Sequence, residues 1–523
     1  MAAPKRVLLL TNSEYGQASV HLAVAHTLAE LYRGDVEVHL ASFGPLTDLV
    51  RSASDYATQQ YPGALPFIFH HIKGTDMSAA WGRPELRLEE YNGLRPGFFN
   101  TPKLLRLLLR LTSPWDGPEF VAIFEAVSAL ILETVKPDVA AVDPAFSPAV
   151  TACVHTKTKF CILAPNTIKD FSMPFQPWGQ AFWRYPALAS GLPYPLPWYL
   201  VPLNIYFMLY IVLYIVITKP TKNLTAYVRQ HTKPNATPLT LNLLNRFPPP
   251  GVKYLVANLP ELEFPHLRMP PHLVPCGPMV RPAPSVSEVD PDLASWLARG
   301  PTVYINTGTL HQTTEWDALE IARSLRALFD RAQQSHYDTT AAYSDSEKEE
   351  KTSRITTKFA GGNLQVLWKL TKRGNYGAAE KGSRVHSVLE EELDSDRVRI
   401  VPWLHPEPPA ILAEPSIVCA VHHGGANSFL EAVSAGVPHI VLPVWIDCFD
   451  FASRAELLGI GRWANRRTLP LNSARELGPA LIDVVLSEEH SESMRHGAEQ
   501  LAEICGRNGG GRVLAARTIM EKI

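Results

Sequence analysis

The sequence predicts an α/β protein built from two parallel-sheet units, and three observations lead to this fold class. Short Val- and Leu-rich runs alternate with amphipathic helical segments, first near the N-terminus and again after residue 300. Proline runs at Phe247–Pro250, Pro270–Pro271 and Arg281–Pro284 separate the two stretches, as expected of a stiff connection between domains. The length of 523 residues is sufficient for more than one hydrophobic core.

The first stretch has the strand–helix–strand order that produces a parallel sheet. Strands are expected at Val7–Leu10 and Val36–Ala41, with a helix over Ala18–Leu31 between them. The pattern returns with a helix at Phe120–Val135 and a strand at Val139–Val142. We therefore expect an N-terminal α/β domain over residues 1–265.

The second stretch repeats this order. Its predicted strands are Thr302–Asn306, Leu364–Trp368, Val398–Val401, Ile417–Val421 and His439–Leu442, and its predicted helices are Ala318–Phe329 and Ser428–Ala435. Tyr337–Lys358 is rich in Ser, Thr, Glu and Lys and has too few large apolar residues to offset the entropy of ordering. We expect a C-terminal α/β domain over residues 266–500 with a disordered loop at 337–358, followed by a C-terminal helix at 501–523.

Composition and charge argue against several classes of protein. The formal net charge is −2, from 49 Lys and Arg against 51 Asp and Glu, so the chain is not built to coat nucleic acid. Six cysteines without a CxxC pair favour buried, reduced thiols over a disulfide framework or a zinc site. Val7–Leu10 is too short to be the core of a signal peptide. These features predict a cytoplasmic protein.

One apolar segment leaves its relation to membranes open. No charged residue occurs from Tyr185 to Thr218, Lys219 follows this segment, and Val201–Ile217 is nearly all apolar or Tyr. This length approaches the roughly 20 residues of a membrane span, but prolines break the first half of the segment. Three interpretations remain: a buried or acceptor-lining segment, a peripheral membrane contact through residues 198–217, and a true span.

The strongest chemical signal is the stretch His423–Glu431, which reads His-Gly-Gly-Ala-Asn-Ser-Phe-Leu-Glu. It follows a predicted strand and opens a predicted helix near Asn427. Free backbone N–H groups and the positive end of the helix dipole suit a phosphate at such a point, and two glycines let the backbone approach the anion. The alternative is an ordinary strand-to-helix turn in which Asn427 or Ser428 caps the helix.

These residues resemble the family 1 UDP-sugar-dependent glycosyltransferases, which have the two-domain GT-B fold. The family's donor box opens with Trp, centres on His-x-Gly-x-Asn-Ser with Glu three residues after the Ser, and ends in an acidic residue and Gln. This chain has Trp403 within Val401–Glu407, the stretch His423–Glu431, and Asp447 followed by Cys448. The resemblance implies two Rossmann-like domains facing each other across a cleft. In its departures from the family pattern, this chain is similar to a fungal branch of the family that acts in specialised metabolism.

The resemblance also implies how a UDP-sugar is held. Trp403 would stack on uracil, Glu431 would hold the ribose hydroxyls, and Asp447 would contact hydroxyls of the sugar. Cys448 stands where the family has a sugar-contacting Gln, and this weakens any inference about which sugar is used. The residues implied at the diphosphate are Thr309, His423, Gly425, Asn427 and Ser428. Without these roles, Trp403 would be a core residue and Asp447 a solvated one.

The general base departs from the family pattern, in which a His directly follows the first-loop Gly. Here Gly16 is followed by Gln17, whose amide has no useful proton affinity near neutral pH. Asp143 falls where the family has the acid that orients this His, and it could accept the proton itself or through water. His21 lies one helical turn beyond Gln17 and could serve through a water, or be a partly buried helix residue. Glu14 is a further carboxylate in the same loop.

The sequence therefore predicts an inverting glycosyltransferase that moves a sugar from a UDP-sugar to a hydroxyl of a lipophilic small molecule such as a terpenoid, polyketide or sterol. The UDP-sugar is a co-substrate, and neither a metal nor a separate cofactor is expected, because a helix dipole can meet the diphosphate charge without a divalent ion. The alternatives are a non-catalytic nucleotide-sugar-binding protein, a GT-B nucleotide-sugar epimerase, and a membrane-embedded transport or scaffold component.

Overall fold

A computed structural model of the chain describes residues 3–86, 94–217, 219–232, 236–309, 311–343, 363–444 and 446–523. The chain forms two compact units. The N-terminal unit comprises Met1–Asn92, Pro96–Pro282 and Cys505–Ile523, and the C-terminal unit comprises Gly93–Arg95 and Ala283–Ile504. Each unit contains one parallel sheet, so the predicted α/β class with two sheets is confirmed.

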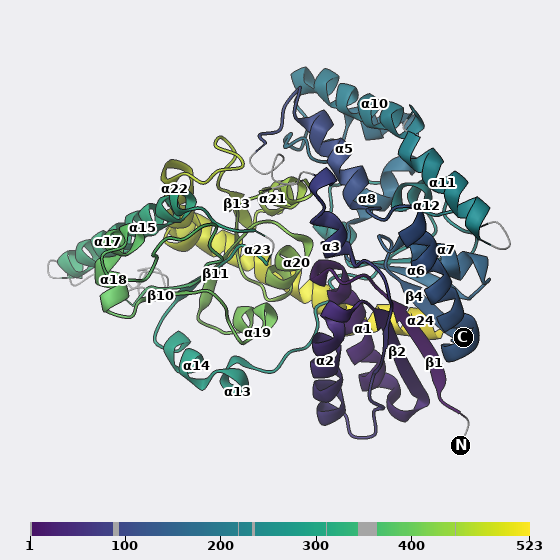
Figure 1. Ribbon diagram of the computed structural model, residues 1–523. Coiled ribbons are helices and arrows are strands. Elements are labelled where there is room, and N and C mark those ends of the chain that lie inside the picture. Colours follow the sequence, from purple (N-terminus) through teal and green to yellow (C-terminus); the bar gives the residue numbers. More distant parts are fainter. Residues whose placement is uncertain are drawn as a thin grey trace. The chain divides into compact units, whose positions relative to one another are not determined.

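The N-terminal unit is built on a seven-stranded parallel sheet with the order β3-β2-β1-β4-β5-β6-β7 (Figure 1). Its strands are β1 (Lys5–Leu10), β2 (Val36–Ser42), β3 (Ile68–His71), β4 (Val139–Val142), β5 (Phe160–Ala164), β6 (Tyr254–Val256) and β7 (Leu273–Pro275). The central strands are continuous apolar runs because helices cover both faces of a parallel sheet. Since β7 pairs with β6, residues 266–282 belong to this unit rather than to the second domain expected from residue 266.

Helices of the N-terminal unit include α1 (Tyr15–Tyr32), α2 (Thr47–Gln60), α5 (Thr101–Leu111), α6 (Gly117–Ala129) and α7 (Ser147–His155). The predicted helix at Phe120–Val135 is α6 with a π-helical turn after it. The end of the chain also belongs here, because α24 (Gly510–Met520) packs on α1. Arg512 joins the two helices by contacting Glu30 and by donating a hydrogen bond to Thr27 at 2.9 Å.

The C-terminal unit has a six-stranded parallel sheet with the order β10-β9-β8-β11-β12-β13. Its strands are β8 (Thr302–Asn306), β9 (Gln365–Lys369), β10 (Val398–Val401), β11 (Ile417–His422), β12 (His439–Val441) and β13 (Gly461–Trp463). Helices α15 (Glu315–Tyr343) and α22 (Ala474–Val485) pack on each other, and α20 (Ala426–Ser434) and α21 (Cys448–Leu457) follow β11 and β12. Each strand predicted in this half is present.

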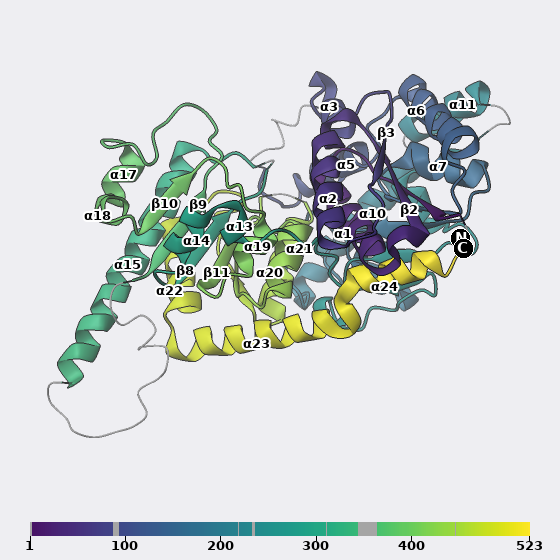
Figure 2. The ribbon, with the colours of Figure 1, turned by 90° about the horizontal axis from the view of Figure 1, so that it is seen from below.

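The prediction of a disordered loop at 337–358 is wrong for residues 337–343. Helix α15 continues to Tyr343, so residues 337–343 are helical, and its end projects beyond the sheet in Figure 2. The helix is anchored by the buried face of Ala318–Phe329. The residues that follow, Arg331, Ala332 and Gln333, have high helix propensity, so the helix can extend beyond its anchored part. Residues 344–358 lie outside the described residues.

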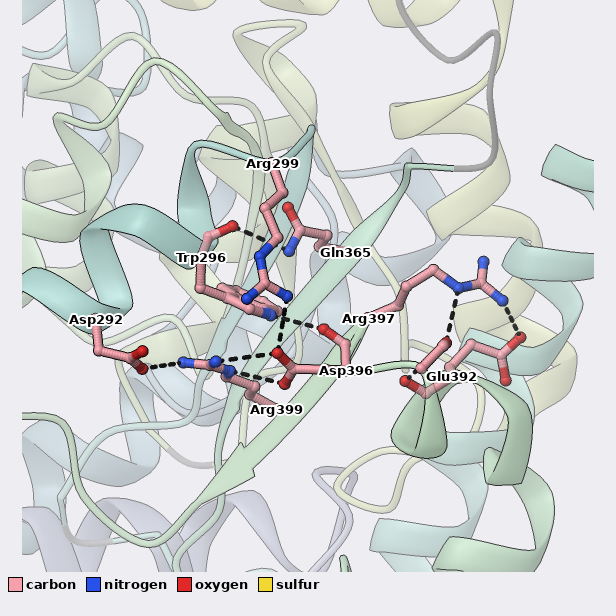
Figure 3. A network of polar contacts seen from close by, with 9 residues as sticks. Asp292, Trp296, Arg299, Gln365, Glu392, Asp396, Arg397 and Arg399 are labelled. Carbon is pink, nitrogen blue, oxygen red and sulfur yellow. Dashed lines mark hydrogen bonds and ion pairs between the residues drawn. The ribbon is translucent and has the colours of Figure 1, made fainter.

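A polar network braces the amino ends of β9 and β10 (Figure 3). The Asp396 carboxylate pairs with Arg299 at 2.9 Å and with Arg399 at 2.9 Å. The Asp396 carbonyl accepts a hydrogen bond from the indole of Trp296 on α14 (Pro291–Leu297), and Gln365 donates to the Trp296 carbonyl. These contacts fix the sheet at one end and leave the carboxyl ends of the strands to the loops described below.

Each sheet has one place where the chain reverses the direction in which it adds strands. In the N-terminal unit this switch lies between β1 and β4, and in the C-terminal unit it lies between β8 and β11. Open parallel sheets bind ligands in the crevice outside the carboxyl ends of the strands at such a point. The loops after these four strands are therefore the places to look for chemistry.

The apolar segment forms α10 (Val201–Ile217), which packs against α9 (Gln180–Trp183) and α5 within the N-terminal unit (Figures 1 and 2). Only Asn204 and Phe207 of this helix are buried. The stretch Trp198–His231 is long and apolar enough to cross a membrane, yet only 11% of its most apolar window is buried. The expectation that this segment is buried is therefore wrong for α10, whereas its lining of an acceptor site stays a prediction.

Candidate active site

The turn between β11 and α20 contains two glycines that the local geometry requires. Gly424 has φ of +85°, and a Cβ there would lie 2.9 Å from the Cys448 carbonyl oxygen and from the Val441 side chain. A Cβ on Gly425, which precedes the first residue of α20, would collide with the His423 ring. Because Gly424 and Gly425 have no side chains, the backbone of this turn is open directly before the first turn of α20. The N–H groups of that first turn lack intrahelical partners and can bind an anion.

A buried histidine pair supports this turn. The backbone N–H of Gly424 donates to His422 Nδ1 at 3.1 Å, so His422 must carry its proton on Nε2. That N–H points to His439 Nδ1 at 2.9 Å. Burial holds the pKa of His422 well below its usual range and lowers that of His439 to about 3, so both rings are neutral. Sequence reasoning missed this pair, although the His422-His423 doublet was a signal.

His423 lies between the turn and the loop after β8. A Cβ on Gly308, which has φ of +89°, would be 2.8 Å from the His423 ring. Burial, followed by the charges of His311 and Lys369, lowers the pKa of His423 to about 4. The ring is therefore neutral near pH 7 and acts as a hydrogen-bond donor rather than a cation. Its Nδ1 has no hydrogen-bond partner among the residues that the structure describes.

Lys369, the last residue of β9, is a functional candidate that sequence reasoning missed. Lys369 is only 5% exposed, and its Nζ donates a hydrogen bond to the Gly308 carbonyl at 3.3 Å. Burial lowers its pKa, and no carboxylate forms an ion pair with it within the described ranges. A buried ammonium without an anion is unfavourable, and this makes Lys369 a candidate to bind a negatively charged ligand. The signal was a lysine ending the otherwise apolar strand Gln365–Lys369.

Trp403 lies in the loop after β10 and is 61% exposed, so it is not the core residue of the alternative interpretation. The Lys369 ammonium is 4.6 Å from the centre of its ring, which leaves much of the indole open to a ligand. Trp403, Lys369, Gly308 and His423 thus form a continuous series of contacts at the carboxyl ends of β8 to β11.

The remaining donor-side residues surround this series. Asn427 and Ser428 are half-buried in the first turn of α20, and Glu431 lies one turn further, near Tyr304. Thr309 is exposed after Gly308. Asp447 is half-buried before α21, so it is not fully solvated, whereas the Cys448 side chain is completely buried and presents no exposed thiol to a sugar.

The switch of the N-terminal unit is organised by Asp143, which directly follows β4 and is fully buried. One carboxylate oxygen accepts the backbone N–H of Ala145 at 2.8 Å. The other accepts the side-chain amide of Asn12 and, at 3.4 Å, its backbone N–H. Burial raises the pKa of Asp143 to about 7, with a further contribution from the charge of Glu14. Asn12 follows β1, so this pair spans the switch.

Gln17 and His21 lie on α1, away from this pair. Gln17 is half-buried in the first turn, and its side-chain oxygen has no partner in the described part of the chain. His21 is fully buried and its Nδ1–H donates to the Gln17 carbonyl at 3.3 Å. Burial lowers the pKa of His21 to about 4. No hydrogen bond joins His21 to Asp143 among the described residues, so the structure does not assemble the two into a dyad.

Comparisons with known proteins agree with this geometry. Residues 343–496 match the family described as UDP-glucoronosyl and UDP-glucosyl transferase. The glycosyltransferase sdnJ of Sordaria araneosa is 30% identical, with 98% of this chain and 97% of that protein aligned. The UDP-glycosyltransferase stmC of Aspergillus ustus is 26% identical over 42% of this chain and 36% of its own length.

Solved structures show the same fold. A UDP-glucosyltransferase from Polygonum tinctorium has a TM-score of 0.59 at 13% identity, with 100% of this chain and 99% of that chain covered. The glycosyltransferase of kitacinnamycin has a TM-score of 0.60 at 14% identity, with 100% of both chains covered. The two parallel-sheet units are thus those of the GT-B fold, and with a relative aligned over nearly its whole length, this chain belongs to the UDP-glycosyltransferase family.

Proposed function

We propose that this UDP-glycosyltransferase moves a sugar from a UDP-sugar to a hydroxyl of a lipophilic small molecule, with inversion at the anomeric carbon. The observation that carries the donor part is the buried Lys369, which has no carboxylate partner among the described residues and lies beside His423 and the glycine turn of α20. Two cationic or donor side chains and a helix N-terminus converge where a diphosphate needs them.

Each donor-side residue has a defined role in this proposal. Trp403 stacks on uracil, and Glu431 accepts hydrogen bonds from the ribose. Lys369, His423 and the first turn of α20 bind the diphosphate and stabilise its charge as the bond to the anomeric carbon breaks. Asp447 contacts hydroxyls of the sugar. The UDP-sugar is a co-substrate, and the proposal includes no metal or other cofactor.

The proposed acceptor class rests on relatives and on chemistry. The Polygonum enzyme is described as capable of glucosylating indoxyl, and another neighbour, Os79 from O. sativa with a TM-score of 0.57, was solved with a trichothecene. Family membership also favours transfer over the binding-protein and epimerase alternatives. A cytoplasmic location fits the free cysteines, all of which are buried.

A nucleotide screen tests the donor site. UDP should raise the midpoint of thermal unfolding, whereas GDP and dTDP should not, because a ligand that binds only the folded state stabilises it. UDP-sugars with a panel of apolar alcohols and phenols should then give glycoside and UDP in equal amounts. Binding of UDP with neither transfer to any acceptor nor donor hydrolysis would return the protein to the class of non-catalytic binders.

We also propose that α10 makes a peripheral membrane contact. Leu209 and Leu213 on this helix are 55% and 58% exposed, and Trp198 just before it is 84% exposed. The buried Asn204 accepts the Ala187 N–H at 2.7 Å and donates to the carbonyls of Phe182 and Tyr185. Because these contacts tie α10 along the unit, the helix lies at a membrane interface rather than crossing it.

The charges near α10 favour anionic lipids as its partner. From Phe171 to Pro260 the sequence has no aspartate or glutamate. The neighbouring α5 also has no acidic residue, and its Lys103, Arg106 and Arg110 are exposed. Lipid headgroups of negative charge would pair with these cations while the apolar side chains enter the interface.

Flotation with vesicles tests this contact. Wild-type protein should float with vesicles that contain phosphatidylserine and less with phosphatidylcholine alone. The double variant Leu209→Ser and Leu213→Ser should stay with the soluble fraction, whereas Leu471→Ser, which changes a similarly exposed leucine of the C-terminal unit, should float as wild type does. Equal flotation of the double variant, or self-association through α10 without lipid, would refute the membrane proposal.

A further inference from the structure

We propose that Glu14 is the catalytic base that removes the proton from the acceptor hydroxyl. This inference rests on the proposed transferase function and names a group for a step that the family's usual His cannot perform here. Glu14 lies in the loop between β1 and α1, at the switch of the N-terminal sheet, where a ligand of this unit is expected.

The other groups in this region are unsuited to contact an acceptor. Gln17 has no useful proton affinity, and His21 is fully buried inside α1. Asp143 is also fully buried, and both of its oxygens already accept hydrogen bonds from Ala145 and Asn12. Glu14, at the N-cap of α1, is half-buried rather than fully buried.

Asn12 holds Glu14 in place. Its side-chain NH₂ donates to Asp143, which fixes the orientation of the amide, and its side-chain oxygen then accepts the backbone N–H of Glu14 at 2.7 Å. Asp143 is thereby a positioning residue, because it acts on Glu14 through Asn12. The sequence separates Asp143 from this loop by more than a hundred residues, and the pairing of β1 with β4 brings them together.

The carboxylate itself is oriented by α1. Glu14 Oε2 accepts the backbone N–H of Gln17 at 3.1 Å, and a Cβ on Gly16 would lie only 2.6 Å from this oxygen. Gly16 therefore gives the carboxylate its position over the first turn. The Gln17 side-chain oxygen, which has no partner among the described residues, can accept a hydrogen bond from a bound ligand beside it.

The electrostatic environment suits a base that works near neutral pH. Burial raises the pKa of Glu14, and the hydrogen bonds from Gln17 and Gly16 offset part of this rise. The titratable group that faces it from the end of β4 is Asp143. A carboxylate with a raised pKa is a stronger base than one with the ordinary pKa.

The step balances without a further reagent. The acceptor O–H proton passes to the Glu14 carboxylate while the acceptor oxygen forms a bond to the anomeric carbon of the UDP-sugar. The bond between that carbon and the diphosphate oxygen breaks, and its electron pair leaves with UDP. Glu14 then releases the proton to water.

Variants of Glu14 test this assignment in a protein whose wild type transfers sugar. Glu14→Gln keeps the shape and the cap but not the base, so kcat should fall by about 100- to 10,000-fold, with an unchanged unfolding midpoint and an unchanged shift with UDP. Glu14→Asp should retain intermediate activity, and formate or azide should partly restore Glu14→Ala. Glu133→Gln, an exposed carboxylate of the same unit, serves as the matched control.

Two results would overturn the inference. Activity of Glu14→Gln within about threefold of wild type would show that another group takes the proton. A loss that comes with a lower unfolding midpoint, and that small anions do not restore in Glu14→Ala, would assign Glu14 a structural role. Absence of transfer by the wild type with every donor instead counts against the proposed function itself.

Discussion

The two switch points of this protein are built on one topological plan but distribute their chemistry differently. At the switch of the C-terminal unit, the turn from His422 to Ser428 is a continuous piece of sequence that carries most of the proposed diphosphate contacts. At the switch of the N-terminal unit, the organising pair is Asn12 and Asp143, which come from two distant segments. The contiguous donor stretch retains the family motif. In the site assembled from distant segments, Gln17 stands where the family has a His, and we propose that the neighbouring Glu14 has the role of the base.

The sharpest test of the contiguous site is removal of His423. His423→Ala deletes the neutral donor that we propose for the leaving diphosphate and should lower kcat by about 100- to 1,000-fold. Steady-state kinetics at saturating donor measure this loss. His496→Ala, on the exposed face of α23 (Glu488–Gly506), is the control and should be silent. A loss below about threefold would show that the donor motif does not serve the diphosphate.

The assembled site should reveal itself through the pH dependence of stability. The raised pKa of Asp143, about 7, means that between pH 5 and 7 the folded state keeps a proton that the unfolded chain has lost. Its contribution to stability is complete below pH 4 and is lost as the pH rises through 7, by about 2 kcal/mol between pH 5 and 7. Chemical denaturation of wild type and Asp143→Asn at several pH values should show this slope only in the wild type.

The histidines with lowered pKa values act in the opposite direction, because they stabilise the fold as the pH rises toward 6.5. The difference between wild type and Asp143→Asn cancels their contribution. Parallel curves for the two proteins would mean that Asp143 is ionised in the folded state at pH 5 and is not the proton-holding centre of the assembled site.

Lys369 distinguishes a ligand site from a structural one within the C-terminal unit. Lys369→Ala removes a charge-assisted contact worth about 1.5–3 kcal/mol and should weaken UDP binding by about 10- to 100-fold, measured by calorimetry. Lys372→Ala, on a lysine that pairs with Glu380, is the control and should leave affinity unchanged. Unchanged UDP affinity in Lys369→Ala would argue that the ammonium serves only the Gly308 loop.

Trp403 should show the smallest effect. Trp403→Ala removes stacking worth about 1–3 kcal/mol, so KM for the donor should rise about tenfold, with little change in the unfolding midpoint because the side chain is largely exposed. Trp316→Ala alters a similarly exposed indole on α15 and should not change KM. A drop in stability without a change in KM would place Trp403 outside the donor site.

The sequence predicted the parts of the fold that rest on contiguous patterns. The apolar runs of β1, β4, β8 and β11 are long enough to be recognised, and the donor residues share one motif. Edge strands such as β3 and β7 were not predicted, because they have four and three residues and partly exposed patterns.

Lys369 and the His422–His439 pair have no periodic or spacing signature, and only the packed loops give them meaning. The roles of Asp143 and Asn12 could not be predicted either, since their hydrogen bond depends on which strands become neighbours. Helix α15 was cut short in the prediction because composition was judged without the propagation of a helix from its buried start.

The packing of α24 on α1 has a consequence for folding during synthesis. Arg512 on α24 must contact Glu30 and Thr27 on α1 to complete the N-terminal unit. Helix α1 is synthesised early, and it lacks these contacts until α24 has been made. Folding during translation usually finishes an N-terminal domain early. Here α24 must be synthesised before α1, whose N-cap is Glu14, obtains this neighbour, and removal of α24 should therefore disable the proposed acceptor side first.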